Sequence, residues 1–364
     1  MTDRIQTGII GANMTYGWGA RAHLPALAAL PEFELSGVCT TQMETAKETA
    51  NHFGIPHTFD DHYELINHPD IELVIVCVRV PSHHRLVMDA LAAGKHVYCE
   101  WPLGANLAEA QEMRELAEAK GVKHMVGLQA RGAPVFNHMR QLIAEGYVGR
   151  VLSCTMNSSL GGAGIRPSYF AWAADRSKGA NTLTIHGGHS IDALCYVLGD
   201  FREVSATISA MITTATVTDT NETIPVTAPD HMLVNSVLES GALASIHIRN
   251  VPAHGTGFVF EVHGTEGALI VTSDIQAQMG ELALRGGRKG DAALAELPTP
   301  EEHRWIPNTV PDGPPINMGQ MFTRLARGIR EDAPIDPDFN RAVKLHELIA
   351  AMDRASDTGQ RQRP

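Results

Sequence analysis

The feature that most constrains this chain is the alternation, over its first 127 residues, of short apolar runs with stretches of helical periodicity. One helix stands out at 107–120, where Asn106 caps, Glu109 occupies the capping-box position and Gly121 ends the apolar stripe. Strand and helix in repetition build a parallel sheet through right-handed crossovers. We therefore predict an α/β fold that begins with a doubly wound Rossmann domain over residues 1–127. Its predicted strands are 6–10, 33–39, 73–78, 96–99 and 124–126.

After residue 127, strand-like runs follow one another with little helix between them, which indicates an open, mostly antiparallel sheet. We predict a second, α+β domain over 128–364 that binds substrate and supports oligomerisation. Residues 280–319 are rich in glycine and proline and predict a long surface excursion, and 359–364 a frayed tail. The predicted strands are 151–158, 204–217, 231–238, 243–250, 257–262 and 268–272, with helices at 134–145, 189–198 and 340–355.

Composition narrows the class of protein. A length of 364 residues suits two domains, and 29 Lys+Arg against 41 Asp+Glu give a net charge of −12, which disfavours nucleic acid as a direct partner. The five cysteines form no C-x-x-C pair, and no window approaches about 18 consecutive apolar residues. We expect a cytoplasmic protein with free thiols, no membrane segment and no bound metal.

A glycine-rich turn follows the first predicted strand and includes Gly11, Asn13, Gly17 and Trp18. Small residues let backbone N–H groups approach a pyrophosphate at a helix N-terminus, although such a turn is often only a tight connection. Asn13 stands at the second glycine of G-x-G-x-x-G, and asparagine tolerates a positive φ. We predict a dinucleotide site here.

The second predicted strand ends at Thr40 and Thr41, where an NAD site usually places an acid on the ribose. No acid stands there, and no arginine or lysine follows at once to hold a 2′-phosphate. The choice between NAD(H) and NADP(H) therefore stays open, and Thr40 and Thr41 are cofactor candidates.

Four motifs, at 76–84, 94–103, 128–131 and 188–192, together resemble the glucose-fructose oxidoreductase, inositol dehydrogenase and rhizopine catabolism (Gfo/Idh/MocA) family. The resemblance runs from residue 8 to about residue 272. It implies an NAD(P)-dependent oxidoreductase of sugars or cyclic polyols that forms homodimers or homotetramers. It also implies that Glu100 contacts the nicotinamide ribose and that Arg79, His83, Trp101 and Gln129 belong to the cofactor site.

Two positions depart from the family pattern. Trp101 replaces the lysine of the family's E-K-P motif, and Ile185 replaces the acid of D-x-G-x-H. Both changes resemble those of the galactose-pathway repressor branch, whose members bind a dinucleotide without catalysis. Trp101 either stacks on a sugar ring or packs in the core.

Oxidation of a carbinol carbon needs a base for the hydroxyl proton. The resemblance nominates His189, with Asp192 one turn later to orient its ring or to bind a hydroxyl. His186 either replaces the missing acid or is a solvated histidine. Its helical spacing to His189 suits metal ligands, but no third ligand is near, and we predict no zinc there.

Two cations are candidates to stabilise a developing alkoxide. Lys178 replaces the missing lysine or is simply a solvated loop residue, and Arg131 suits an acidic or polyhydroxylated substrate. We therefore expect hydride transfer between a nicotinamide and a sugar or polyol carbon. The alternatives are a non-catalytic NAD(P)- and sugar-sensing regulator and an NAD-dependent oxidoreductive glycosidase.

Overall fold

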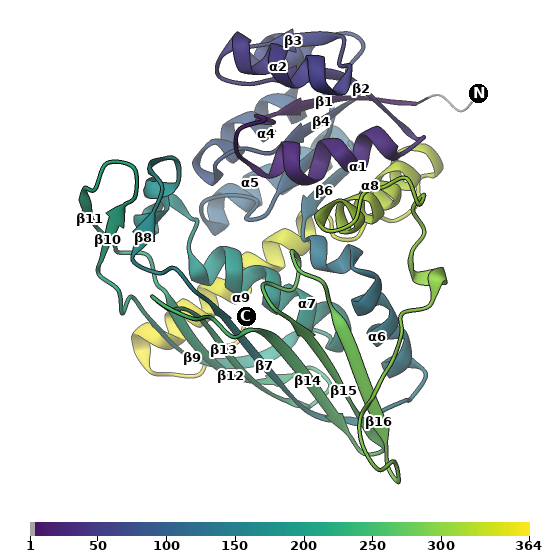
Figure 1. Cartoon of the computed structure of the whole chain (residues 1–364), viewed down its shortest axis with the longest axis vertical. Coiled ribbons are helices and arrows are strands. Elements are labelled where there is room, and N and C mark those ends of the chain that lie inside the picture. The colour runs from purple at the N-terminus through teal and green to yellow at the C-terminus, as the bar shows by residue number, and fades with distance from the viewer. Residues whose placement is uncertain (1–3) are drawn as a thin grey trace. The chain divides into compact units, whose positions relative to one another are not determined.

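The computed structural model describes residues 4–364, which form two compact units (Figure 1). The first unit combines the chain up to Gly132 with Arg304–Val343, and the second combines Ala133–His303 with Lys344–Pro364. This differs from the predicted division at residue 127, because the chain returns to the first unit. Helix α8 (Pro314–Glu331) buries Met321 and Phe322 in the first unit's core beside Leu27 and Phe33.

The first unit is built on a six-stranded parallel sheet in the order β3-β2-β1-β4-β5-β6. This order confirms the doubly wound prediction. Sequence reasoning missed β3, because three residues are too few to show a period. The strands are β1 Ile5–Ile10, β2 Phe33–Cys39, β3 His57–Phe59, β4 Leu73–Val76, β5 His96–Glu100 and β6 His124–Gly127.

Helices flank this sheet, and Figure 1 shows α1 and α8 side by side. The helix predicted at 107–120 is confirmed as α5, and the Asn106 Oδ1 accepts a hydrogen bond of 3.0 Å from the Glu109 N–H. The first crossover begins as a π-helix at Gly19–His23. The other helices around this sheet are α1 Leu24–Ala29, α2 Met43–Phe53, α3 His62–Asn67, α4 His83–Ala92 and α5 Leu107–Lys120, with 3₁₀ turns at Val80–Ser82 and Gln129–Gly132.

The second unit contains an eight-stranded sheet in the order β17-β16-β15-β14-β7-β13-β12-β9. All its pairs are antiparallel except β7 with β13, which confirms the predicted α+β class. A small sheet, β11-β10-β8, stands beside it. The strands are β7 Val151–Leu160, β8 Ile165–Arg166, β9 Phe201–Ser209, β10 Thr214–Val217, β11 Thr223–Pro225, β12 His231–Leu238, β13 Leu243–Asn250, β14 Gly257–Gly264, β15 Gly267–Ser273, β16 Ala283–Arg288 and β17 Ala295–Glu296.

Helices α6 (Pro134–Ala144) and α7 (Gly188–Leu198) and most of α9 (Phe339–Thr358) lie over one face of this sheet (Figure 1). A π-helix at Thr182–Gly187 runs directly into α7. Short 3₁₀ turns occupy Ser168–Ala174, Arg176–Lys178 and Glu301–His303. No helix within residues 4–364 is long and apolar enough to cross a membrane.

Three local predictions for this unit are wrong. The run 204–217 is two strands, because Asp230 accepts hydrogen bonds from the Met211 and Ile212 N–H groups between them. The excursion at 280–319 contains β16 and β17, and a Cβ at Gly286 would lie 2.6 Å from a Leu297 methyl, so this glycine is a packed strand residue. The predicted frayed tail is instead tied to β9 through Gln362.

Candidate cofactor and catalytic sites

The turn after β1 is shaped by three glycines. Gly11 has φ +101°, and a Cβ there would lie 2.2 Å from the Cys77 carbonyl oxygen. Gly17 has φ +111° with open space around it. A Cβ at Gly19 would lie 2.9 Å from the Ala12 Cα, so this glycine lets the first helix pack on the strand. The turn thus has the small residues that a pyrophosphate cradle needs.

Asn13 and Trp18 fill out this turn. Asn13 does not use the positive φ that asparagine tolerates, since among the non-glycine residues of 4–364 only Asn221 and Asp332 have a positive φ. Its Oδ1 instead accepts a 2.7 Å hydrogen bond from the Thr15 N–H, which folds the loop locally. Trp18 packs against the first unit's core.

Acidic residues reach the carboxyl end of β2 from a neighbouring strand. Thr40 is buried and its hydroxyl donates to the Gln42 carbonyl at 2.8 Å, while Thr41 is exposed. The Thr40 N–H also donates to Phe59, the last residue of β3, which is followed by Asp60 and Asp61. Burial, and then the charges of Asp61 and Asp60, raise the pKa of the Cys39 thiol to about 12. Sequence reasoning missed these acids because it missed β3.

The Glu100 carboxylate lies at the end of β5 in a hydrogen-bonded cluster. Its Oε1 is 2.9 Å from the Nε2 of buried His23, and its Oε2 accepts a 2.6 Å hydrogen bond from Gln129. A Cβ at Gly127 would lie 2.6 Å from Oε1, so this glycine makes room for the carboxylate. Burial, and then the Glu100 charge, raise the pKa of the Tyr98 hydroxyl. Glu100 and Gln129, which were both predicted for the cofactor site, are therefore hydrogen-bonded to each other, and His23 belongs to the same cluster.

His83, Trp101 and Arg79 come from the same part of the first unit. The His83 ring lies between two backbone carbonyls, with Nδ1 2.8 Å from Pro102 and Nε2 3.1 Å from Val78. Burial lowers the His83 pKa. His83 thus lies between two loops of the first unit, and its predicted place in the cofactor site stays a prediction. Trp101 is 4% exposed and therefore buried, whereas Arg79 is exposed just before the 3₁₀ turn at Val80–Ser82.

Arg131 is already engaged within the first unit. Its Nη1 donates to both carboxylate oxygens of Asp336 at 2.7 and 2.8 Å, and its side chain is nearly buried. Its carbonyl accepts a hydrogen bond from Arg324. The structure therefore gives Arg131 a role in fastening the returning segment, and its predicted contact with substrate stays a prediction.

In the second unit, His186 lies inside a chain of neutral polar groups. Its Nε2 is 2.6 Å from the Ser158 hydroxyl and its Nδ1 is 3.3 Å from the Asn250 Oδ1, while the Asn250 amide donates to the Thr182 hydroxyl at 2.9 Å. The network assigns the proton to Nδ1, so Ser158 donates to Nε2. Burial, and to a smaller degree the charge of His189, lower the His186 pKa to about 4. The alternative of a solvated His186 is wrong, since it is 2% exposed.

His189 and Asp192 follow on α7, one turn apart, and both are buried. His189 lies near enough to His186 to influence its pKa, so the structure brings these two predicted residues together. Lys178 lies apart from them in sequence and environment: its side chain is about half exposed and its Nζ is 4.0 Å from Asp175. The structure favours the solvated alternative for Lys178.

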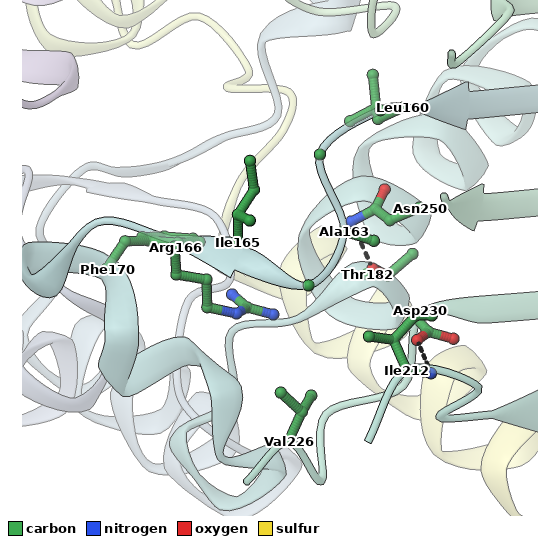
Figure 2. Close-up of a pocket in the computed structure, with 13 residues that line it drawn as sticks. Leu160, Ala163, Ile165, Arg166, Phe170, Thr182, Ile212, Val226, Asp230 and Asn250 are labelled. Atoms are coloured by element: carbon green, nitrogen blue, oxygen red, sulfur yellow. Dashed lines mark hydrogen bonds between the residues drawn. The ribbon is translucent and has the colours of Figure 1, made fainter. Parts of the chain in front are cut away.

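A pocket of about 150 Å³ in the second unit is lined by Asn250 and Thr182, which belong to the hydrogen-bond network of His186. Figure 2 shows the bonded pair Asn250 and Thr182 on one side, Phe170 on the other, and the Arg166 guanidinium between them. Burial lowers the Arg166 pKa, and the charge of Asp230 opposes this. Residues 160–164 complete one wall with three glycines. Sequence reasoning missed this pocket, because its walls come from strands far apart in the chain.

Two family models match the chain. Residues 5–128 match the oxidoreductase family with an NAD-binding Rossmann fold (Gfo/Idh/MocA), and residues 134–273 match the Gal80p C-terminal domain.

Individual relatives agree with these models. A dehydrogenase, AclE, of Aspergillus oryzae is 33% identical over 61% of this chain, and the match spans 62% of the length of that relative, less than two thirds. Levoglucosan dehydrogenase of Pseudarthrobacter phenanthrenivorans is 28% identical over 92% of both chains. The crystal structure of the transcriptional regulator Gal80p from Kluyveromyces lactis has a TM-score of 0.84 and 25% identity, over 100% of this chain and 92% of that one.

Proposed function

The chain belongs to the Gfo/Idh/MocA oxidoreductase family, and from that premise we propose that it is an NAD(P)-dependent oxidoreductase of a sugar or cyclic polyol. One observation carries the proposal most directly: the glycine turn and the Glu100 cluster lie in a unit that matches an NAD-binding domain. In this proposal the first unit binds the dinucleotide, which accepts the hydride when bound, and the second unit binds the carbohydrate.

The second unit would supply the proton acceptor. A hydroxyl must lose its proton as the carbon beside it loses hydride, and we assign that proton to the imidazole of His189, with Asp192 orienting the ring. His186 has a different part. A pKa of about 4 makes its imidazole a weak base at working pH, so His186 positions Asn250 and Thr182 rather than accepting the hydroxyl proton.

The pocket beside the His186 hydrogen-bond network suits a ligand with hydroxyl groups. Asn250 and Thr182 offer neutral donors and acceptors, and Arg166 offers five N–H donors from a partly desolvated position. The volume of about 150 Å³ is below the roughly 300–1,000 Å³ of drug-sized sites. We propose that it receives part of a single sugar or polyol ring.

Asp60 and Asp61 bear on the choice of dinucleotide. Their charges act at the carboxyl end of β2, where the ribose 2′-position of a bound dinucleotide would lie. A 2′-phosphate there meets like charge, whereas a 2′-hydroxyl does not. We propose a preference for NAD(H) over NADP(H).

A second function is favoured by one specific observation: the match to the Gal80p C-terminal domain, together with Trp101 and Ile185 at the positions where family enzymes carry a lysine and an acid. In that alternative the chain binds dinucleotide and sugar without turnover. The third alternative, an oxidoreductive glycosidase, would cleave a glycoside with no net change in the cofactor.

Cofactor turnover separates these functions. The purified protein is given NAD or NADP with a panel of anhydrosugars, monosaccharides, glycosides and inositols, and reduced nicotinamide is followed by absorbance. The proposal expects turnover with one ring class, lost by about 10²–10⁴ in His189→Ala with unchanged dinucleotide affinity. Dinucleotide binding with no turnover on any ring would support the regulator instead, and aglycone release without net reduction would support the glycosidase.

We also propose that the protein works in the cytoplasm as a homodimer or homotetramer and binds no nucleic acid directly. All five cysteines are free and buried, which suits a reducing compartment. The open face of the second unit's sheet exposes Leu233 and Leu243 at 48% and 59% of their surface, and a second copy would cover these side chains. Light scattering of the purified protein tests the assembly, and a monomer at micromolar concentration would contradict it.

A further inference from the structure

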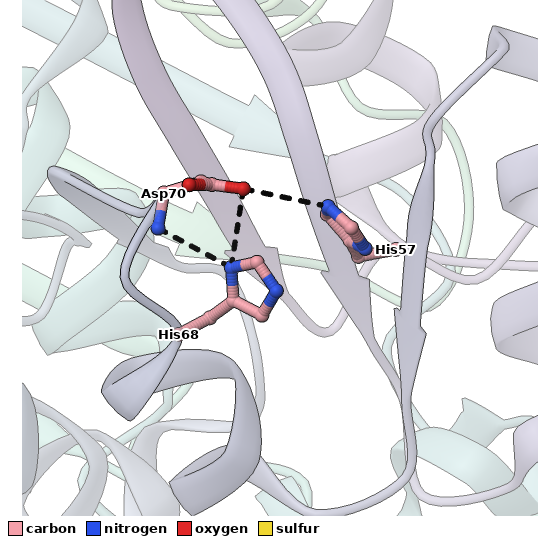
Figure 3. Close-up of side chains that lie close together, drawn as sticks. All are labelled: His57, His68 and Asp70. Carbon is pink, nitrogen blue, oxygen red and sulfur yellow. Dashed lines mark hydrogen bonds and ion pairs between the residues drawn. The ribbon is translucent and has the colours of Figure 1, made fainter.

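Three metal-ligating side chains meet in the first unit, away from the groups discussed above. His57 begins β3, His68 follows α3, and Asp70 lies just before β4 (Figure 3). All three therefore stand at the amino ends of parallel strands, whereas the glycine turn and Thr40 stand at the carboxyl ends. Ligands of open α/β sheets bind at the carboxyl ends, so the dinucleotide site does not explain this cluster.

The distances within the cluster approach those of a coordination sphere. The Asp70 Oδ2 lies 3.8 Å from the His57 Nε2 and 3.9 Å from the His68 Nδ1, and one ligand atom from each residue lies within 4.8 Å of the others. Four ligands at about 2.0–2.1 Å from a tetrahedral ion are separated from one another by about 3.3 Å. The difference is about half an ångström for each pair that Asp70 makes, and the side chains of His57 and Asp70 are 39% and 62% exposed, so rotations of these side chains can bring the three ligand atoms closer together.

The local backbone holds two of the ligands together. The Ile71 N–H donates to the His68 carbonyl at 3.1 Å, which closes a turn with Pro69 at its second position. Lys95 donates from its Nζ to the carbonyls of His68 and Ile71, at 3.3 and 2.6 Å, and so fixes the same turn. The Asp70 N–H makes only a long bond of 3.3 Å to the His68 Nδ1, which a metal ion on that nitrogen would replace.

The ligand set selects the kind of ion. Two imidazoles and one carboxylate suit Zn²⁺ and its transition-metal neighbours, whereas Mg²⁺ and Ca²⁺ prefer oxygen ligands alone. The rings of His57 and His68 have their centroids 4.3 Å apart and are tilted by 40° to each other. Of the three ligands, the Asp70 carboxylate is the one that carries negative charge for a cation.

We propose that His57, His68 and Asp70 form a binding site for Zn²⁺, with water completing the coordination. The ion would tie β3, the short edge strand of the six-stranded sheet, to the loop that leads into β4. Its role is therefore to fasten the sheet edge, and it is separate from the proposed hydride transfer.

Zinc binding and thermal unfolding test the proposal on the full chain. Chelator-treated protein is titrated with ZnCl₂ by calorimetry, and its unfolding temperature is measured with and without Zn²⁺. We expect micromolar or tighter binding and a raised unfolding temperature, since an ion that binds only the folded state stabilises it. His57→Ala, His68→Ala and Asp70→Asn should each weaken binding by about tenfold or more and remove the rise in unfolding temperature. MgCl₂ should do neither.

His84→Ala is the matched control. His84 is also a surface histidine beside a carboxylate, with its Nε2 2.7 Å from Glu112, but it belongs to no cluster of three ligands among the described residues. This variant should bind Zn²⁺ as the parent does. The proposal is overturned if His57→Ala and Asp70→Asn, both at partly exposed positions, bind Zn²⁺ as tightly as the parent, or if the parent binds only at millimolar Zn²⁺. NADH binding by each variant reports folding independently.

Discussion

Each unit buries a histidine in a hydrogen-bonded cluster, and the two clusters differ in charge. His23 in the first unit faces the Glu100 carboxylate, whereas His186 in the second faces a hydroxyl and a side-chain amide. Burial removes water from the charged form of the His186 imidazole, and the hydrogen bond to Asn250 offsets this only in part, so the His186 pKa falls to about 4. The same residue type thus serves a charged site in one unit and a neutral one in the other.

The difference matches the ligands that the proposal assigns to the units. A dinucleotide presents ribose hydroxyls that a carboxylate such as Glu100 binds strongly, because hydrogen bonds to charged acceptors are the stronger kind. A sugar ring presents many neutral hydroxyls, each both donor and acceptor, which Asn250 and Thr182 match without carrying charge.

The largest effect should follow from breaking the charged cluster. Glu100→Ala leaves the Nε2 of buried His23 and the amide of Gln129 without their acceptor, so we expect a loss of about 3 kcal/mol in the free energy of unfolding. Dinucleotide affinity should fall as well. Urea unfolding and NADH titration measure the two. Glu100→Gln, which keeps the shape, should lose less, and equal losses would contradict the role of charge.

The neutral cluster around His186 should make the free energy of unfolding depend on pH. The unfolded His186 has an ordinary pKa near 6.5 and the folded one about 4, so the unfolded state binds more protons between these values and stability falls as the pH drops through this window. We expect His186 to account for about 2 kcal/mol lost between pH 7 and pH 5. His186→Gln should flatten the stability profile measured by urea unfolding. A Ser158→Ala profile should keep the parent slope, and a His186→Gln slope equal to the parent's would refute the assignment.

Breaking the neutral cluster should cost less than breaking the charged one. Asn250→Ala removes the acceptor of the His186 Nδ1–H, and because Asn250 lines the pocket, water can partly replace it. We expect a loss of about 1–2 kcal/mol in unfolding free energy, with unchanged NADH affinity and a raised KM for the sugar. A loss as large as that of Glu100→Ala would break the comparison.

The charge of the first unit should also set dinucleotide preference. Replacing Asp60 and Asp61 by asparagine removes two negative charges. The asparagine at position 61 can still cap the N-terminus of α3, as the Asp61 side chain does now. We expect the affinity for NADPH relative to NADH to rise by roughly fivefold to tenfold, measured by fluorescence titration. An unchanged ratio would show that these acids do not act on the ribose.

The smallest effect should come from Lys178. Its ammonium is about half exposed and 4.0 Å from Asp175, so water screens the pair. Lys178→Ala should leave the unfolding temperature and the NADH affinity unchanged. A marked fall in sugar turnover would instead restore the prediction that Lys178 replaces the missing lysine.

Much of the fold followed from local patterns. Helix α5 has the bounds and the Asn106 cap that its sequence predicts, and β12 and β13 keep their predicted limits. The failures have physical reasons: β3 is too short for a period to show, and Gly286 reads as a loop residue although it packs within a strand. The roles predicted for Glu100, His186 and His189 remain proposals. The structure adds which residues surround Glu100 and His186.

What the sequence determined by itself is the class of fold, the glycine turn and the identity of the side chains available for chemistry, because period, capping and turn preferences act over a few residues. The tertiary structure alone decided what those side chains face. Ser158 and Asn250 are 28 and 64 residues from His186, and Glu100 is 77 from His23. Burial and hydrogen bonding, which set the charge of a histidine, depend on such distant neighbours, and no local pattern encodes them.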